Sequence, residues 1–267
     1  MLFDAFLFCN EEMLLEIRLN ELYEKVDRFI LIESNKTFTG LDKPLYFKDE
    51  ILGKSWIQPF LPKLDFYVCN LTEQENWARE RQQRNYIKDV LFNYPMQDDD
   101  MILISDVDEI PNLSIYPQPK LLQISQLFFC LQHHVNECIE LTQSMYYYYF
   151  NNFLYENPWP MVKIMSWKFL KENQPDNIRK TKSPSLLKTR GWHFSFLGDQ
   201  EMILNKLHAF SHQELAAQFT EQNVKEALEQ KRDLFNRPDC KMKTVPLDET
   251  FPKYILNNKE RFAKYVA

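Results

Sequence analysis

The chain opens with LFDAFLFCNEEMLLEIRLNELYEKVDRFILIE (residues 2–33), which predicts a strand, a helix and a second strand. Apolar residues fill 2–9 and 29–32, as is typical of buried strands. Asn10 is the expected N-cap of the helix, because acidic residues occupy the first turn after it. The helix then carries an apolar stripe at helical spacing, formed by Leu15, Leu19, Leu22 and Val26. This order favours a parallel sheet with helices on its faces.

The alternation of strand and helix continues toward the middle of the chain. Residues 66–71 and 101–104 predict further buried strands. Between them, residues 72–75 (TEQE) form a capping box that is expected to open a helix reaching about residue 92. Residues 36–63 contain two of the glycines and three prolines, so a loop is expected there.

The second half of the chain has a different pattern of predicted elements. Strand-like runs follow one another without clear helices between them, at 127–132, 145–153, 161–170 and 192–197. This favours mixed or antiparallel strands added to the parallel sheet. Residues 171–190 are polar and basic and predict a mobile loop, and a helix is expected over 213–235. No linker composition separates the two halves, so we predict one α/β domain.

Glycine is scarce, with 4 glycines in 267 residues, whereas average usage is about 7%. None of them has the spacing of a dinucleotide-binding fingerprint or a P-loop. Any bound phosphate must therefore be held by something other than a glycine loop. The formal net charge of −6 disfavours general nucleic-acid binding, which needs a basic surface.

Cysteine usage and hydropathy bear on the compartment. The five cysteines contain no C-x-x-C pair and predict scattered, reduced thiols. The N-terminal apolar run lacks the basic flank of a signal peptide. No apolar stretch approaches the roughly 18 residues of a membrane helix. We expect a cytoplasmic protein with no integral membrane segment, which leaves peripheral contact with a membrane open.

Two aspartates follow the predicted strand 101–104 almost directly. In the turn beyond the strand, Asp106 and Asp108 can converge on one cation, and ligands of open α/β sheets bind at this end of the strands. Carboxylate oxygens suit Mg²⁺ or Mn²⁺. Such an ion neutralises a diphosphate without a glycine loop. The plain alternative is a solvated acidic turn.

Histidine and arginine supply further candidates. His193 lies between two glycines in GWHFSFLG (191–198) and is the candidate third metal ligand, with core packing as the alternative and His212 as a competitor. Arg79 and Arg84 of the expected helix are candidates to bind a diphosphate, with a solvated helix face as the alternative.

Aromatic residues suggest a sugar-binding surface. The run YYYYF (146–150) would place rings on both faces of a strand. Tyr148 and Trp192 are the candidates for stacking on a sugar or base. Packing in the core is the alternative for each ring.

Six blocks of sequence occur in order, within a resemblance that runs over about residues 2–260. They are FDAFLFCNEEMLLEIRLNELYEKVDRFILIESNKTFTG (3–40), KPLYF (43–47), RERQQRNYI (79–87), ISDVDEIP (104–111), GWHFSFLG (191–198) and FSHQE (210–214). Together they resemble glycosyltransferase family 17. The resemblance implies a GT-A fold, whose sheet is mixed and mainly parallel and is flanked by helices. It also implies an inverting transfer from a UDP-sugar, typically UDP-N-acetylglucosamine (UDP-GlcNAc), with a divalent metal, usually Mn²⁺.

The resemblance also assigns roles along the single domain 1–267. Residues 1–111 would form the nucleotide-binding half, and 112–267 the acceptor-side half and C-terminal tail. Asp106 and Asp108 match the D-x-D motif that holds metal and donor diphosphate. His193 is similar to a late histidine that completes the metal shell in several GT-A families.

Two strand ends are further donor-binding candidates by the same resemblance. Asn10 and Glu11 stand at the end of the first strand, and Glu33 closes the second, where such folds often contact the nucleobase. Animal members of the family carry an N-terminal anchor and stem that this sequence lacks. We therefore expect a cytoplasmic microbial or viral enzyme acting on an oligosaccharide, glycolipid or glycoprotein glycan.

The implied mechanism is a direct displacement at the anomeric carbon, with a carboxylate as general base. Glu214 and Asp199 are candidates for that base because they follow the presumed acceptor-side strands, and Glu109 is a third because it lies beside the metal. Two alternatives stay open. One is a haloacid-dehalogenase-like phosphatase that uses Asp106 and Asp108, and the other is a non-catalytic glycan-binding module.

Overall fold

Four parallel strands form the first part of the sheet in this computed structural model, which describes residues 1–113, 137–183, 185–211, 219–237 and 240–267. The strands are β1 (Leu2–Phe8), β2 (Arg28–Ser34), β3 (Leu64–Cys69) and β4 (Met101–Asp106). Helix α1 (Glu12–Leu22) connects β1 to β2, and α2 (Asn76–Leu91) connects β3 to β4. The predicted strand–helix–strand opening is therefore confirmed.

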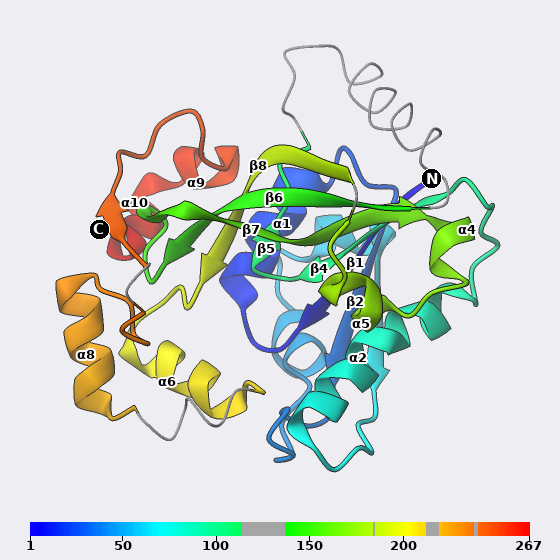
Figure 1. Cartoon of the computed structure of the whole chain (residues 1–267), viewed down its shortest axis with the longest axis horizontal. Coiled ribbons are helices and arrows are strands. Elements are labelled where there is room, and N and C mark those ends of the chain that lie inside the picture. The colour runs from blue at the N-terminus through cyan, green and yellow to red at the C-terminus, as the bar shows by residue number, and fades with distance from the viewer. Residues whose placement is uncertain (114–136, 184, 212–218, 238–239) are drawn as a thin grey trace.

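Strand β1 is buried on both faces, which explains its nearly continuous apolar sequence. Leu2 and Phe6 pack in one core with the predicted apolar stripe of α1. Phe3 and Leu7 point the other way, into a second core that includes residues of α2. The two helices thus cover opposite faces of the parallel strands (Figure 1).

Both predicted helix starts are wrong in detail. Asn10 is exposed and does not cap α1; Glu11 is the N-cap residue, and its carboxylate accepts hydrogen bonds from the N–H groups of Cys9 and Asn10. Helix α2 begins at Asn76 instead of Thr72. The expected loop 36–63 contains a π-helical turn, η1 (Phe47–Ile51), and a 3₁₀ helix, η2 (Gln58–Lys63).

The second half adds β5 (Glu109–Ile110), β6 (Cys138–Tyr147), β7 (Asn152–Ser166), β8 (Ser185–Ser195) and β9 (Met242–Thr244). The predicted strand 127–132 lies outside the described residues. Over the described residues, the sheet has nine strands in the order β3-β2-β1-β4-β7-β6-β8-β5, with β9 paired to β7. The α/β class and the mixed sheet are confirmed, but the expectation of a mainly parallel sheet is wrong. Among the described strands, the pairs beyond β4 are antiparallel except for β6–β8, because β5, β7 and β9 run against their neighbours.

The aromatic run 146–150 is not part of one strand, so the predicted strand 145–153 is wrong. Strand β6 ends at Tyr147, and Tyr148 has a positive φ of 64° in the turn to β7. Tyr146, Tyr147 and Tyr148 are all buried. The tyrosine run is long enough to form a strand. In the folded protein, however, the backbone changes direction at Tyr148, between β6 and β7.

The second half contains regular structure where a loop is expected from the sequence. The expected loop 171–190 contains α5 (Pro175–Lys180) and the start of β8, and a short helix α4 (Trp167–Leu170) precedes it. Helix α6 (Gln200–Ala209) was not predicted. Of the expected helix 213–235, residues 213–218 lie outside the described part, and α8 (Glu221–Gln230) ends before residue 235. Among the described helices, none is both long and apolar enough to cross a membrane.

The C-terminal helices α9 (Lys253–Asn257) and α10 (Lys259–Phe262) dock on α1. Glu16 of α1 accepts hydrogen bonds from the Tyr254 hydroxyl at 2.6 Å and from Arg261 at 2.7 Å. Glu21 accepts one from the backbone N–H of Tyr254. The last residues of the chain are thereby held against its first helix.

Gly191 allows β8 to pass close to the segment after β5. A Cβ at this position would lie 2.6 Å from the carbonyl oxygen of Ile110 and 2.9 Å from the backbone nitrogen of Asn112. Gly191 is thus a position of close backbone approach that a larger residue would not allow. It lets β8 pair with β5, which brings Glu109 opposite His193.

We expect Gly191→Ala to lower the free energy of unfolding by about 1–3 kcal/mol, because rigid backbone atoms must shift. Gly53→Ala is the matched control, since a Cβ there meets nothing within 4 Å, and we expect its effect to stay within about 0.5 kcal/mol. Urea denaturation followed by circular dichroism measures both. Equal stability of the two variants would contradict this account of Gly191.

Candidate active site

The acidic turn at the carboxyl end of β4 is the centre of the site. Asp106 is the last residue of β4, and Val107 anchors the turn by burying its side chain and donating its N–H to the carbonyl oxygen of Leu7. Glu109 then begins β5. The aspartates thus stand at the edge of the sheet where α/β proteins bind ligands.

Arg18 of α1 fixes this turn from inside the protein. Its guanidinium is fully buried and pairs with Asp4 of β1, at 2.8 Å from Nε to Oδ2. It also donates to the carbonyl oxygens of Asp106 at 3.0 Å and Glu109 at 2.9 Å, and to the Ser105 hydroxyl at 2.6 Å. One buried cation therefore sets the path of the backbone that carries the aspartates.

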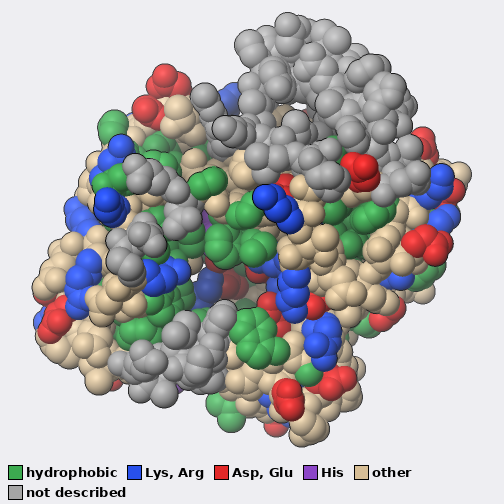
Figure 2. All heavy atoms as spheres, viewed as in Figure 1, with side chains coloured by type: hydrophobic (Ala, Val, Ile, Leu, Met, Phe, Trp, Pro, Cys, Tyr) green, Lys and Arg blue, Asp and Glu red, His purple; other side chains and the backbone are tan. Residues whose placement is uncertain are grey.

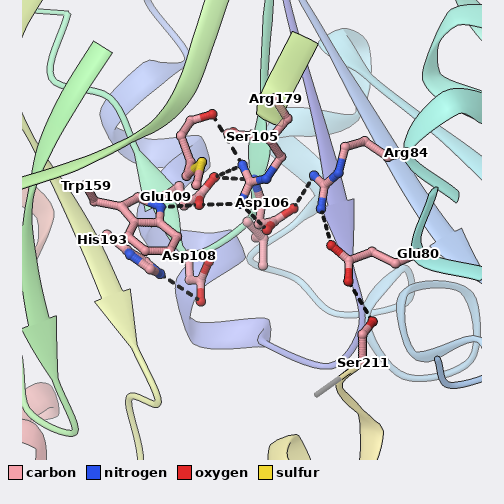
Figure 3. A network of polar contacts seen from close by, with 12 residues as sticks. Glu80, Arg84, Ser105, Asp106, Asp108, Glu109, Trp159, Arg179, His193 and Ser211 are labelled. Carbon is pink, nitrogen blue, oxygen red and sulfur yellow. Dashed lines mark hydrogen bonds and ion pairs between the residues drawn. The ribbon is translucent and has the colours of Figure 1, made fainter. Parts of the chain in front are cut away.

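Two arginines hold the carboxylate of Asp106. Arg84 of α2 donates to Oδ1 and Arg179 of α5 donates to Oδ2, each at 2.8 Å (Figure 3). Arg84 also contacts Glu80, which accepts a hydrogen bond from Ser211. Burial alone would raise the pKa of Asp106, but the two guanidinium groups hold that pKa below its ordinary value.

Glu109 is the most constrained acid of the site. Its carboxylate accepts hydrogen bonds from Arg179 at 2.7 and 2.8 Å, from the backbone N–H of Asp106 at 2.8 Å, and from the indole of Trp159. The Trp159 ring lies 4.7 Å from that of His193 between centroids. Glu109 is buried and thus acts in this structure as an anchor for Arg179 and Trp159.

Asp108 pairs with Lys206 of α6. The distance from Lys206 Nζ to Asp108 Oδ2 is 2.7 Å, and Glu11 Oε1 lies 3.5 Å from the same ammonium. His193 Nε2 is 3.7 Å from Asp108 Oδ2. Burial alone would raise the pKa of Asp108, but Lys206 and His193 hold it well below its ordinary value. Burial opposes the charge of Lys206, but Asp108 and Glu11 raise its pKa.

The predicted metal ligands do not fit a bound ion as they are arranged. Their oxygen and nitrogen donors suit Mn²⁺, and the structure brings Asp108 and His193 side by side. However, the carboxylates of Asp106 and Asp108 are already paired with cationic side chains. Among the described residues, no group of three acidic, histidine or cysteine side chains is arranged to hold a metal ion. His193 Nδ1 is buried and has no hydrogen-bond partner within the part of the chain that the structure describes, whereas metal-bound histidines normally have one.

Several predicted donor-binding residues are engaged in the fold. Both oxygens of buried Glu33 accept hydrogen bonds, from Lys43 and the backbone N–H of Tyr46 on one side and from Phe47 on the other. Arg79 donates to the backbone carbonyls of Phe38 and Gln74. Neither side chain joins the cluster around Asp106.

The predicted stacking residues are not open to a sugar. Tyr148 is 1% exposed, and its hydroxyl donates to the carbonyl of Arg232 and accepts from the N–H of Leu234. Trp192 is buried and donates to the carbonyl of Thr250. The sugar-stacking surface predicted for these rings is therefore wrong in this structure.

The remaining predicted residues fall in different places. Asn10 is exposed, while Glu11 reaches Lys206 and so borders the site. Asp199 is the N-cap of α6, where its carboxylate accepts from the N–H of Met202. Glu214 and His212 lie outside the described residues. Figure 2 shows a hollow between α5 and α6 in which basic and acidic side chains lie together.

A family model for glycosyltransferase family 17 matches residues 1–265, nearly the whole chain. The chain belongs to glycosyltransferase family 17. No curated protein sequence matches it closely enough to serve as a relative. Membership of family 17 means that the chain is a glycosyltransferase, with a sugar donor and a glycan acceptor as its substrates.

Sequence reasoning missed two cations of this family 17 site. Asp4 is the one charged residue in the apolar run 2–8, a pattern that signals a buried ion pair, and its partner Arg18 lies between two apolar residues of α1. Lys206 gave no such signal, because its role depends on how α6 packs. Arg179 was expected only as part of a basic loop, and the structure places it in a helix facing Asp106.

We expect Arg18→Met to destabilise the family 17 fold by about 3–5 kcal/mol, because it leaves the buried Asp4 charge unpaired. The control Arg28→Met removes an exposed ion pair with Asp65 and should cost less than about 1 kcal/mol. Guanidinium chloride denaturation measures both values. A small effect at Arg18, similar to that at Arg28, would show that the acidic turn does not depend on it.

Proposed function

We propose that the chain transfers N-acetylglucosamine from UDP-GlcNAc to a glycan hydroxyl, with inversion at the anomeric carbon to give a β-linkage. The observation that carries the proposal is the turn with Asp106 and Asp108, held by Arg18 at the carboxyl end of β4. Donor diphosphates need compensating charge, and this turn gathers charged groups from four helices.

The balance of charge at the turn favours a cation that enters with the donor. Arg84, Arg179 and Lys206 supply three positive charges. Apart from Asp176, five carboxylates of the described residues contact these cations, so the balance is 3 − 5 = −2. They are Glu11, Glu80, Asp106, Asp108 and Glu109. Asp176 adds one negative charge, which its partner Lys180 cancels. A diphosphate meets less repulsion here when a divalent cation, Mn²⁺ or Mg²⁺, accompanies it.

The two rival functions have weaker support. A phosphatase of the haloacid dehalogenase type needs a free carboxylate as nucleophile, but guanidinium groups hold both oxygens of Asp106. A glycan-binding module built on the tyrosine run needs open rings, but Tyr146, Tyr147 and Tyr148 are buried. Family membership favours the transferase over both.

Calorimetric titration with UDP tests the donor class. We expect wild-type protein to bind UDP, with an affinity that rises when Mn²⁺ is present. Asp108→Ala should lose that metal dependence. Asp98→Ala is the matched control, because Asp98 forms an exposed pair with Lys171, and it should bind as the wild type does. A wild-type protein that binds no UDP would contradict the proposal.

The stereochemistry has its own test. UDP-GlcNAc carries an α-linked sugar, so slow hydrolysis with inversion releases β-N-acetylglucosamine first. Proton NMR of the anomeric signals distinguishes the two products before they equilibrate. Release of the α-anomer first would rule out the inverting mechanism and leave the donor assignment standing.

We propose Glu214 as the general base, because Glu109 is engaged by Arg179 and Trp159 and Asp199 caps a helix. Glu214→Gln should slow turnover by at least about 100-fold, a usual contribution of a general base. Asp199→Asn should keep activity, because asparagine also caps helices well. Steady-state donor turnover measures both. An active Glu214→Gln variant beside an inactive Asp199→Asn variant would assign the role of base to Asp199. If both variants keep full activity, neither residue is the base.

A further inference from the structure

A buried ion pair lies in the sheet, beside the cluster around Asp106 but outside it. Lys163 of β7 and Glu140 of β6 are opposite each other in the antiparallel pairing of these strands, and Lys163 Nζ lies 2.9 Å from Glu140 Oε1. Both side chains are buried. Lys163 is also opposite Ile104 of β4, two residues before Asp106. The pair is therefore next to the strand that carries the first aspartate of the motif.

The pair holds the segment that follows α5. Lys163 Nζ donates to the carbonyl oxygen of Thr181, the C-cap residue of the helix, at 3.2 Å. A cation is favourable there, because the last carbonyls of a helix lack partners within it. Glu140 accepts a hydrogen bond from the backbone N–H of Ser183, whose hydroxyl donates to the carbonyl oxygen of Cys138. The C-terminal end of α5 is thereby attached to β6 and β7.

Helix α5 depends on such attachments because it is short. It has six residues, and an isolated helix of this length is not stable in water. Its N-terminal end lies on α2, where the Asn85 side chain accepts from the N–H of Asp176 and Arg84 Nε is 3.7 Å from the Asp176 carboxylate. One end of the helix is thus held by α2 and the other by the buried pair.

Arg179 is the residue whose position this attachment sets. It lies two residues before Thr181, and its guanidinium donates two hydrogen bonds to Glu109 and one to Asp106. It also donates to the carbonyl oxygen of Met161, in the same strand as Lys163, at 3.3 Å. The fork geometry of a guanidinium makes such contacts sensitive to the placement of the backbone that carries it. A shift of the chain at Thr181 would therefore disturb the contact with Asp106.

We propose that Lys163 and Glu140 are positioning residues of the donor site, and that their buried pair aims the Arg179 guanidinium at Asp106. This inference rests on the proposed function, which places the donor at the acidic turn. Stability alone does not account for the pair, because apolar residues of similar volume often replace a buried ion pair without loss. Apolar residues could not provide the hydrogen bond that fixes the end of α5.

The test removes the charges of the pair without leaving either partner unpaired. In the double variant Glu140→Gln with Lys163→Met, glutamine keeps an acceptor for the N–H of Ser183, and the ammonium on the carbonyl of Thr181 is lost. We expect its melting temperature to stay within about 3 °C of the wild type. Lys163→Met alone should lower the melting temperature by about 10 °C, since the Glu140 charge is then buried and unpaired.

NMR of the arginine side chains reads the placement of Arg179 directly, without nucleotide. With nitrogen-15-labelled arginine, Arg179→Lys identifies the guanidinium signal of Arg179, whose hydrogen-bonded protons should exchange slowly with water. In the double variant we expect this exchange to be at least about tenfold faster, the scale of one weakened charged hydrogen bond. The signal of Arg18 should keep its exchange rate, because Asp4 and the acidic turn hold it.

Calorimetry with UDP connects this placement to the donor. The double variant should bind UDP about tenfold more weakly than the wild type, again the scale of one charged hydrogen bond. Adding both changes to Arg179→Met should cause no further loss, because the pair acts through Arg179. Val224→Ala is the control for lost stability. It leaves a cavity beneath α8, well away from α5 (Figure 1), and should change neither measurement.

An unchanged exchange rate of the Arg179 guanidinium in the double variant overturns the proposal. So does an equal acceleration at Arg18, which would show general loosening, or a double variant that does not fold, because the pair would then serve stability. If Arg179 exchanges faster but UDP binds as it does to the wild type, the pair does not serve the donor site. A wild type that binds no UDP contradicts the donor assignment instead, while the exchange rates still decide whether the pair positions Arg179.

Discussion

The buried pair between Asp4 and Arg18 is the contact on which the site depends. Charges taken out of water persist only when their hydrogen-bonding capacity is met, and the guanidinium of Arg18 meets it with the Asp4 carboxylate, the Ser105 hydroxyl and carbonyls of the acidic turn. The first strand, the first helix and the turn after β4 are thereby joined at one point. The D-x-D motif is positioned by the core of the protein more than by its own turn.

Around that fixed turn, the charged groups come from elements that are distant in sequence. Arg84 belongs to α2, Arg179 to α5 and Lys206 to α6. Glu109 connects several of them, because its carboxylate holds Arg179 and Trp159 at once. The turn thus carries charged groups of both signs and has no glycine-rich loop of the kind found in P-loop and dinucleotide-binding folds. The scarcity of glycine in the sequence is consistent with this arrangement.

The sequence was most informative where structure is local. Periodicity and apolar runs were enough to predict β1, α1 and β2, and the position of Asp106 after a buried strand. Prediction failed where distant contacts compete with local preference. The backbone turns at Tyr148 although its neighbours favour a strand, because the Tyr148 hydroxyl is hydrogen-bonded to the backbone of residues 232 and 234. Lys206 could not be predicted, because nothing in α6 itself indicates that it meets Asp108.

The docking of α9 and α10 on Glu16 of α1 has a consequence for how the protein is made. The same helix presents Arg18 to the acidic turn, two residues further along. A ribosome releases the first strand and helix long before residues 254–261 emerge. Until residues 254–261 have been synthesised, Glu16 of α1 lacks its partners Tyr254 and Arg261, so we expect α1 to reach its final packing, and the acidic turn its final support, only after they emerge.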